Sequence, residues 1–178
     1  MEISTAIAVS GFFIGVGIAA GLFGGLYYTT GRNPILRKRK TVDISYQGIS
    51  SLKDYFETEY VGNPDEIQVL DCSFNGLTSL EGCPRNLEEL WCAGNQINSL
   101  KGCPENCRYL NCSSNNITTL DGISQKLEYL YCTHNKLKSL VGCPQSLYGL
   151  WCGFNDITSF EGLPGNVAVI CYKPNPIS

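Results

Sequence analysis

Residues 87–100 read LEELWCAGNQINSL, and residues 127–140 read LEYLYCTHNKLKSL. The apolar residues, the cysteine and the asparagine fall at the same places in both stretches, and the same register fits segments that begin near residues 67, 107 and 147. Successive copies are twenty residues apart. A fixed period of this length is typical of a solenoid, in which each turn packs only against its neighbours. The repeat therefore decides the fold.

Each repeat predicts one short strand whose leucines and cysteine point inward and whose neighbours pair with it in parallel. About six strands are expected, near residues 68–72, 88–92, 108–112, 128–132, 148–152 and 168–172. Twenty residues leave no room for a helix on the outer side of a turn, where Gly-Cys-Pro stretches favour extended or tightly turned backbone. The predicted fold is a mainly β solenoid, an arc of about six parallel strands with an extended convex side.

The pattern L-x-x-L-x-C-x-x-N-x-I-T-S-L-x-G-C-P-x-x, over residues 67–172, resembles the short, cysteine-bearing leucine-rich repeats of large DNA viruses that infect amoebae, and of some bacteria. The resemblance implies that the recurring asparagine forms a ladder in which side-chain amides bond backbone groups of adjacent turns. The residues at this position are Asn75, Asn95, Asn115, Asn135 and Asn155. A viral source would imply a minor structural protein of the virus particle, linking its internal membrane to the capsid.

Segments of different character flank the repeats. Residues 41–66 are expected to form a degenerate N-terminal cap repeat, whose insertion contains a possible short helix. Residues 67–162 hold the leucine-rich repeats, and residues 163–178 form a C-terminal cap. A solenoid needs such caps because its core is open at both ends.

Residues 1–28 predict a transmembrane helix, because the chain has no charged residue from Ile3 to Gly31. At about 1.5 Å per residue, residues 3–28 are long enough to cross a hydrocarbon core of roughly 30 Å. The alternative is a cleaved signal peptide, but that favours a basic start and a shorter apolar run. Five glycines of this segment have the spacing that lets membrane helices pack closely, although they could equally have no specific role. They are Gly11, Gly15, Gly17, Gly21 and Gly25.

Residues 29–40 form a basic juxtamembrane connector in this interpretation. Lysine and arginine gather on the cytoplasmic flank of a membrane span, which predicts a single-pass protein with its N-terminus outside and its repeats in the cytoplasm. Anionic lipid is a candidate ligand for the end of the connector, and a pure topology signal is the alternative. The lipid-proximal candidates are Arg37, Lys38, Arg39 and Lys40.

The ten cysteines all fall at repeat positions or in the last strand, so core packing explains them. A metal site or disulfides are the alternatives, but the chain has no Cys-x-x-Cys pair and a single histidine, His134, expected to be exposed. No cofactor, metal or catalytic residue is predicted, and no enzyme is expected. Residues 41–178 carry 15 acidic and 8 basic side chains, which disfavours nucleic acid as a partner.

Residues between the core positions of each strand are expected on the concave face. Six of them are aromatic: Trp91, Tyr109, Tyr129, Tyr131, Tyr148 and Trp151. Tryptophan and tyrosine are enriched at interface hot spots, which favours a protein partner on this face. The alternative is that the rings merely cover one another. Glu88, Glu89 and Glu128 predict an acidic rim. The expected function is a membrane-anchored binding scaffold, with a regulatory adaptor or receptor-like module for a soluble cytoplasmic or host protein as the alternative.

Overall fold

The computed structural model describes residues 39–177. The predicted transmembrane helix at residues 1–28, with its glycines, lies outside the described residues, as does the connector up to residue 38. Within the described range, no helix combines the length and the apolar character that crossing a bilayer requires.

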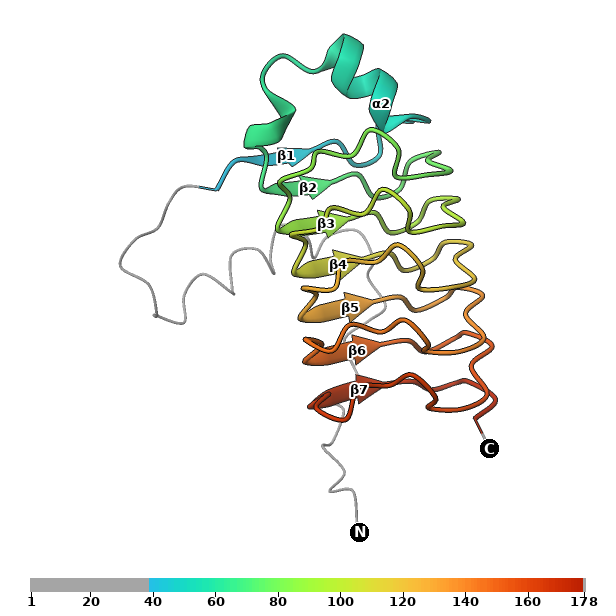
Figure 1. Cartoon of the computed structure of the whole chain (residues 1–178). Helices are drawn as coiled ribbons and strands as arrows, with labels where there is room; N and C mark the ends of the chain where they lie inside the picture. The colour runs from blue at the N-terminus through green and yellow to red at the C-terminus, as the bar shows by residue number, and fades with distance from the viewer. Residues whose placement is uncertain (1–38, 178) are drawn as a thin grey trace. The chain divides into compact units, whose positions relative to one another are not determined.

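Seven strands form one parallel sheet in the order of the chain (Figure 1). Each strand has three residues: β1 Thr41–Asp43, β2 Val69–Asp71, β3 Glu89–Trp91, β4 Tyr109–Asn111, β5 Tyr129–Tyr131, β6 Gly149–Trp151 and β7 Val169–Cys171. From β2 onward the partners in neighbouring strands are twenty residues apart, as in the pairing of Leu90 with Leu110. The predicted parallel solenoid is confirmed. Its sheet has one strand more than expected, because residues 41–43 also join it.

The core lies on the inner side of the sheet. In β3, Leu90 is fully buried while Glu89 and Trp91 are half-buried, which is the alternation expected of a strand with one face on the core. The cysteine that follows each strand from β2 to β6 is also fully buried, as in Cys92 and Cys112. Burial raises the pKa of the Cys152 thiol to about 12, so this side chain packs as a neutral apolar group. The prediction that this cysteine column fills the core is confirmed.

An asparagine ladder runs beside the core. The Asn95 amide nitrogen donates to the carbonyls of Cys72 and Cys92, both at 3.1 Å, and its oxygen accepts the Leu77 N–H at 3.0 Å. The other four predicted rungs bond the backbone of adjacent turns in the same way. A sixth rung, Asn175, accepts the Ile157 N–H at 3.2 Å. Side chains thus satisfy the backbone groups that each tight turn would otherwise leave unpaired.

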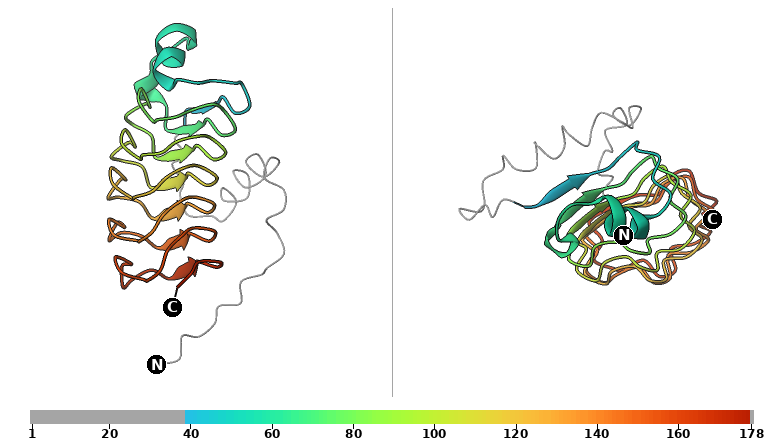
Figure 2. Two further views of the ribbon diagram at one scale, coloured as in Figure 1. Left: turned by 90° about the vertical axis from the view of Figure 1, so that its right-hand side faces the viewer. Right: turned by 90° about the horizontal axis from the view of Figure 1, so that it is seen from above.

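The first turn is longer than the others, because Thr41 of β1 pairs with Val69, twenty-eight residues along the chain. The additional residues form three short helices: α2 Leu52–Asp54, the π-helical turn η1 Tyr55–Glu59 and the 3₁₀ turn η2 Pro64–Glu66. Ser51 begins α2 by accepting the Asp54 N–H at 3.1 Å. Figure 2 shows these helices across the β1 end of the stack, where Leu52 is buried.

The opposite end of the stack is covered less completely. Tyr172, which replaces the column cysteine, packs edge-on against Phe160 with ring centroids 5.0 Å apart. Ile170 is half-buried, whereas its counterpart Leu150 is fully buried. Pro174 accepts the Phe154 N–H at 2.8 Å but has no N–H of its own to donate onward.

Candidate functional site

The outward side chains of β2 to β6 form the surface that we call the strand face. The sheet register arranges them in two columns that run along the stack. One column contains Asp71, Trp91, Asn111, Tyr131 and Trp151, and the other contains Val69, Glu89, Tyr109, Tyr129 and Gly149. Tyr148 lies at the edge, directly before β6. The structure therefore brings all six aromatic candidates onto one face of the sheet.

Five of the six aromatic rings pack against one another. Tyr131 stacks on Trp151 with ring centroids 4.3 Å apart, and Tyr109 stacks on Tyr129 at 5.0 Å. Tyr148 meets Tyr129 edge-on at 5.6 Å. The two stacked separations are close to the spacing of neighbouring strands, about 4.8 Å, because the rings of each stacked pair share one register, whereas Tyr148 lies one residue off the register of Tyr129. The result is a stacked aromatic surface over β4 to β6.

Gly149 leaves room for this packing. A Cβ atom there would lie 2.8 Å from Cζ3 of Trp151 and 3.0 Å from Cδ1 of Tyr129. The Trp151 indole therefore leans across the second column, in the space that a side chain at residue 149 would fill. Trp151 keeps part of its surface accessible, and Tyr148 is 50% exposed.

The first strands of the same face are acidic. The Asp71 carboxylate is half-buried and accepts the Ser73 N–H at 2.9 Å. Burial raises the pKa of Asp71, and the neighbouring Asp43 carboxylate raises it further. Trp91 follows Asp71 in the column and stands next to Asn111, so it marks the border between the acidic and the aromatic parts.

The two described residues of the predicted lipid-contacting set form ion pairs with the solenoid. Arg39 contacts Glu89 and lies 3.2 Å from Oε2 of Glu88, through two different guanidinium nitrogens. Lys40 Nζ lies 2.9 Å from Oε2 of Glu66, and this hydrogen bond raises the pKa of Lys40. Sequence reasoning missed both contacts. Arg37 and Lys38 lie outside the described residues.

At the edge where Tyr148 and Glu88 also lie, Arg108 donates through Nε to Glu128 at 2.9 Å. The Glu128 carboxylate raises the pKa of Arg108. Tyr109 lies beside this pair, and its own pKa is raised by burial and by Glu128, so its phenol stays protonated and able to donate. The predicted acidic rim therefore has two parts, one paired with Arg39 and one paired with Arg108.

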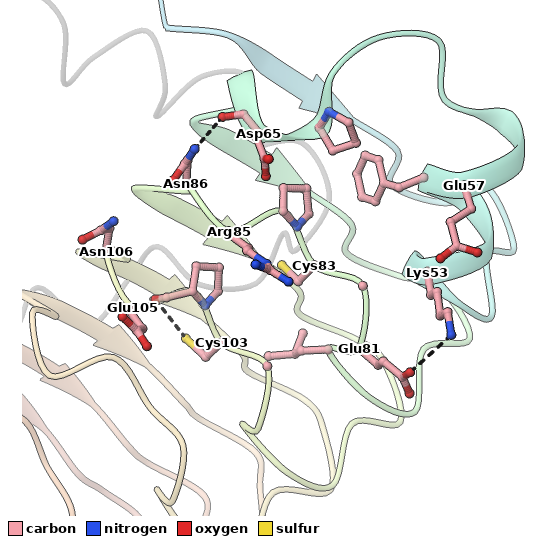
Figure 3. Close-up of a pocket in the computed structure, with 17 residues that line it drawn as sticks. Lys53, Glu57, Asp65, Glu81, Cys83, Arg85, Asn86, Cys103, Glu105 and Asn106 are labelled. Carbon is pink, nitrogen blue, oxygen red and sulfur yellow. Dashed lines mark hydrogen bonds and ion pairs between the residues drawn. The ribbon is translucent and has the colours of Figure 1, made fainter.

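A cleft of about 810 Å³ lies away from the strand face, between the helical insertion and the turns that precede β3 and β4 (Figure 3). Arg85 and Cys83 both line it, as labelled in Figure 3. Lys53 pairs with Glu81 at 3.8 Å. Burial raises the pKa of the Cys83 thiol well above its ordinary value, which disfavours the reactive thiolate form. The mixed charges of the lining favour no particular ligand.

The acidic, cysteine and histidine side chains of the described part of the chain do not gather into a metal-binding cluster. Residues 39–177 contain no group of three or more histidine, cysteine or acidic side chains placed to hold a metal ion. His134 is exposed, as expected, and stacks on Phe154 with ring centroids 4.1 Å apart. Its backbone has a positive φ of 54°, in the tight turn that follows β5. The strand face is therefore the strongest candidate for a functional surface.

No protein-family model and no curated protein matches the sequence. Solved structures do match. YopM of Yersinia pestis, described as a leucine-rich effector protein, is 33% identical with a TM-score of 0.60, over 64% of this chain and 32% of its own. YopM of Yersinia enterocolitica is 25% identical with a TM-score of 0.58, over 66% of this chain and 31% of its own.

An internalin of Listeria monocytogenes, InlF, has the same fold, with 17% identity and a TM-score of 0.54 over 74% of this chain and 47% of its own. The chain thus spans about a third of the length of the YopM chains that it matches. These structural neighbours are leucine-rich repeat proteins, and the parallel solenoid resembles theirs.

Proposed function

We propose that this protein is a protein-binding scaffold that docks its partner on the strand face. The observation that carries the proposal is the stacked, half-exposed aromatic surface over β4 to β6. Rings that already stack on one another lose little conformational freedom on binding, and they offer large apolar areas with polar edges. The leucine-rich repeat neighbours support an interaction role.

We also propose that residues 3–28 anchor the scaffold in a membrane as a single-pass helix, with the repeats on the cytoplasmic side. The support is the uncharged run from Ile3 to Gly31 and the basic cluster that follows it. Deleting residues 3–28 should release the protein from alkali-washed membranes. Protease added outside should leave the repeats of the full chain intact. Retention of the deleted form, or digestion of the repeats, would contradict this proposal.

The scaffold could serve in two settings. The resemblance of the repeat to viral leucine-rich repeats supports a minor structural protein that links an internal membrane to a capsid. The similarity to YopM, described as an effector, supports the alternative of an adaptor for a soluble cytoplasmic or host protein. A structural protein would be stoichiometric with its shell, and an adaptor would be scarce, so the copy number separates the two.

The test of the binding proposal is cross-linking mass spectrometry on the full chain in its native membrane or particle. Replacing Trp91, Tyr131 and Trp151 with alanine should remove the cross-links that join the strand face to its partner. The matched control replaces Val61 and Val141, two exposed apolar residues outside the strand face, with alanine. This control variant should leave the cross-links unchanged. Equal cross-linking of the wild type, the aromatic triple variant and the valine control variant would overturn the proposal.

A further inference from the structure

The strand face has two chemically different halves. Over β4 to β6 it is aromatic, and over β2 and β3 it is acidic; with the adjoining strand β1, this acidic end carries four carboxylates. These are Asp43 and Asp71, which are paired strand to strand, and Glu88 and Glu89 at β3. A partner that covers the whole face must therefore match an acidic end and an apolar end.

The ion pairs of Arg39 show that the acidic end can bind a guanidinium group. Its guanidinium contacts the carboxylates of Glu88 and Glu89 together, with one nitrogen on each. The Glu89 side chain is only 18% exposed, so this pair is shielded from water more than a typical surface ion pair. A planar guanidinium suits such paired carboxylates better than a lysine ammonium does.

One arginine does not neutralise this end. Among residues 39–177, Asp43 and Asp71 have no cationic side chain within ion-pair distance, and both accept hydrogen bonds from nearby serines instead. Desolvation already opposes the charge on Asp71, as its raised pKa indicates. A cation placed there would relieve this cost. Trp91 stands next in the column, and the face of an indole also attracts a cation.

We propose that the strand face binds a segment of a partner protein that carries an arginine, seated on Asp71 and Trp91, and an apolar residue that packs on Tyr131 and Trp151. Three strand spacings separate β3 from β6, about 14 Å, so an extended segment places the two residues about four positions apart. This inference rests on the proposed function and names the chemistry of the partner. Arg39 does not occupy this seat, but it reduces the negative charge beside it by pairing with Glu88 and Glu89.

The first test uses the full chain in neutral maltoside micelles, labelled with 5-fluorotryptophan. The protein has two tryptophans, so a Trp151→Phe variant assigns both ¹⁹F signals. The probe is the peptide acetyl-Arg-Gly-Ser-Gly-Leu-amide, and the control peptide has glutamate in place of arginine. The Trp91 signal should shift saturably with the arginine peptide alone, and less so at high salt. An unmoved Trp91 signal, or equal shifts with both peptides, would overturn the proposal.

Two charge variants then predict effects of opposite sign. Asp71→Asn should weaken binding of the arginine peptide about threefold to fivefold, which is the range for a partly exposed ion pair. Arg39→Gln should tighten it by about the same factor, because Glu88 and Glu89 are released. The matched control is Arg85→Gln, which makes the same change in net charge in the cleft, away from the face. If Arg39→Gln and Arg85→Gln act alike, only net charge matters and the proposed seat is wrong.

The same variants separate this inference from the proposed function. If partner cross-links disappear with the aromatic triple variant but do not change with Asp71→Asn, the proposed scaffold function is supported and the proposed arginine site on Asp71 and Trp91 is wrong. If neither change affects the cross-links, both proposals fall. If the strand face cross-links instead to a second copy of this chain, self-association replaces the arginine-bearing partner.

Discussion

The two sides of the sheet follow different rules, although the same strands build both. On the inner side, successive turns repeat the same residues: leucine in the strand, cysteine after it and asparagine three residues later. On the strand face, neighbouring turns differ, as Asp71, Trp91 and Asn111 illustrate in one column. The inner side is thus a repeated unit and the strand face is a single, non-repeating surface.

The physical reason lies in what each side must match. An inner residue meets the same residue of the next turn in the same register, so one good solution for packing and hydrogen bonding serves every turn. An outward residue meets solvent or a partner, and only its strand propensity is constrained by the fold. Substitutions on the two sides should therefore separate stability from binding.

The largest effect is expected from an inner rung of the ladder. Asn115 is buried and bonds the carbonyls of Cys92 and Cys112 and the Ile97 N–H. Asn115→Ala leaves the Ile97 N–H without a partner, and it removes one of the two amide donors from each of the Cys92 and Cys112 carbonyls, which Asn95 and Asn135 still bond. The orphaned N–H costs about 1–3 kcal/mol and each lost hydrogen bond about 0.5–1.5 kcal/mol, so a loss of about 3 kcal/mol is expected in the free energy of unfolding. Urea denaturation of the full chain in neutral micelles measures it.

The end rung supplies the control for that variant. Asn175 is half-buried and belongs to the last turn, where water can replace its bonds. Asn175→Ala should therefore cost only about 1 kcal/mol. Equal losses for the two variants would show that the ladder does not stabilise the inner turns more than the end.

A smaller effect is expected from changing sulfur to oxygen in the core column. Cys112 has no exposed surface, and burial raises the pKa of its thiol above the ordinary value. Cys112→Ser places a hydroxyl among apolar side chains and should cost about 1–3 kcal/mol by the same denaturation assay. Cys171 is exposed, so Cys171→Ser should stay within about 0.5 kcal/mol of the wild type. A reversed order would argue against the core role of the column.

On the strand face, one substitution should affect binding far more than stability. Trp151→Ala removes the stack on Tyr131 but no fully buried side chain, so we expect a loss of about 1 kcal/mol in unfolding free energy. Its effect on partner binding should reach about 2 kcal/mol, as at interface hot spots. Thermal unfolding and partner titration give the two numbers. A larger loss in unfolding free energy than in binding free energy would show that the rings stabilise the sheet and do not bind a partner.

The smallest effect is expected at Asp71, and it should depend on pH. Because the folded-state pKa of Asp71 is raised, the stability gained from its protonated form is present at low pH and is lost as the pH rises through that pKa. Asp71→Asn cannot ionise, and Asn111 shows that an asparagine in this column makes the same bond, to Ser113 at 3.1 Å.

The Asp71→Asn variant should therefore be as stable as the wild type near pH 3. At pH 7 its free energy of unfolding should be higher than that of the wild type by less than about 0.5 kcal/mol, and its melting temperature should be slightly higher. Thermal scans across this range provide the measurement. A variant that is less stable than the wild type at pH 7 would show that the Asp71 carboxylate is compensated in the fold.

Most of the inner architecture could be predicted from the sequence. The period placed β2 to β7, the Cys112 column and the Asn115 ladder, because each of these features recurs and each recurrence predicts the same contact. Asn175 was missed although it keeps the spacing, because the change from cysteine to Tyr172 draws attention away from it. The five aromatic residues within β3 to β6 could also be assigned to one face, because strand alternation fixes the direction of each side chain, and Tyr148, directly before β6, could be placed at its edge.

The sequence by itself thus determined the turns, the core and the residues of the strand face, because neighbours twenty residues apart meet in one register. Only the tertiary structure decided which unlike residues meet. Thr41 joins Val69 across twenty-eight residues, and Arg39 reaches Glu88 and Glu89, which lie forty-nine and fifty residues along the chain. Such contacts follow no period, since they depend on how the first turn closes and on which side chains it brings beside β3.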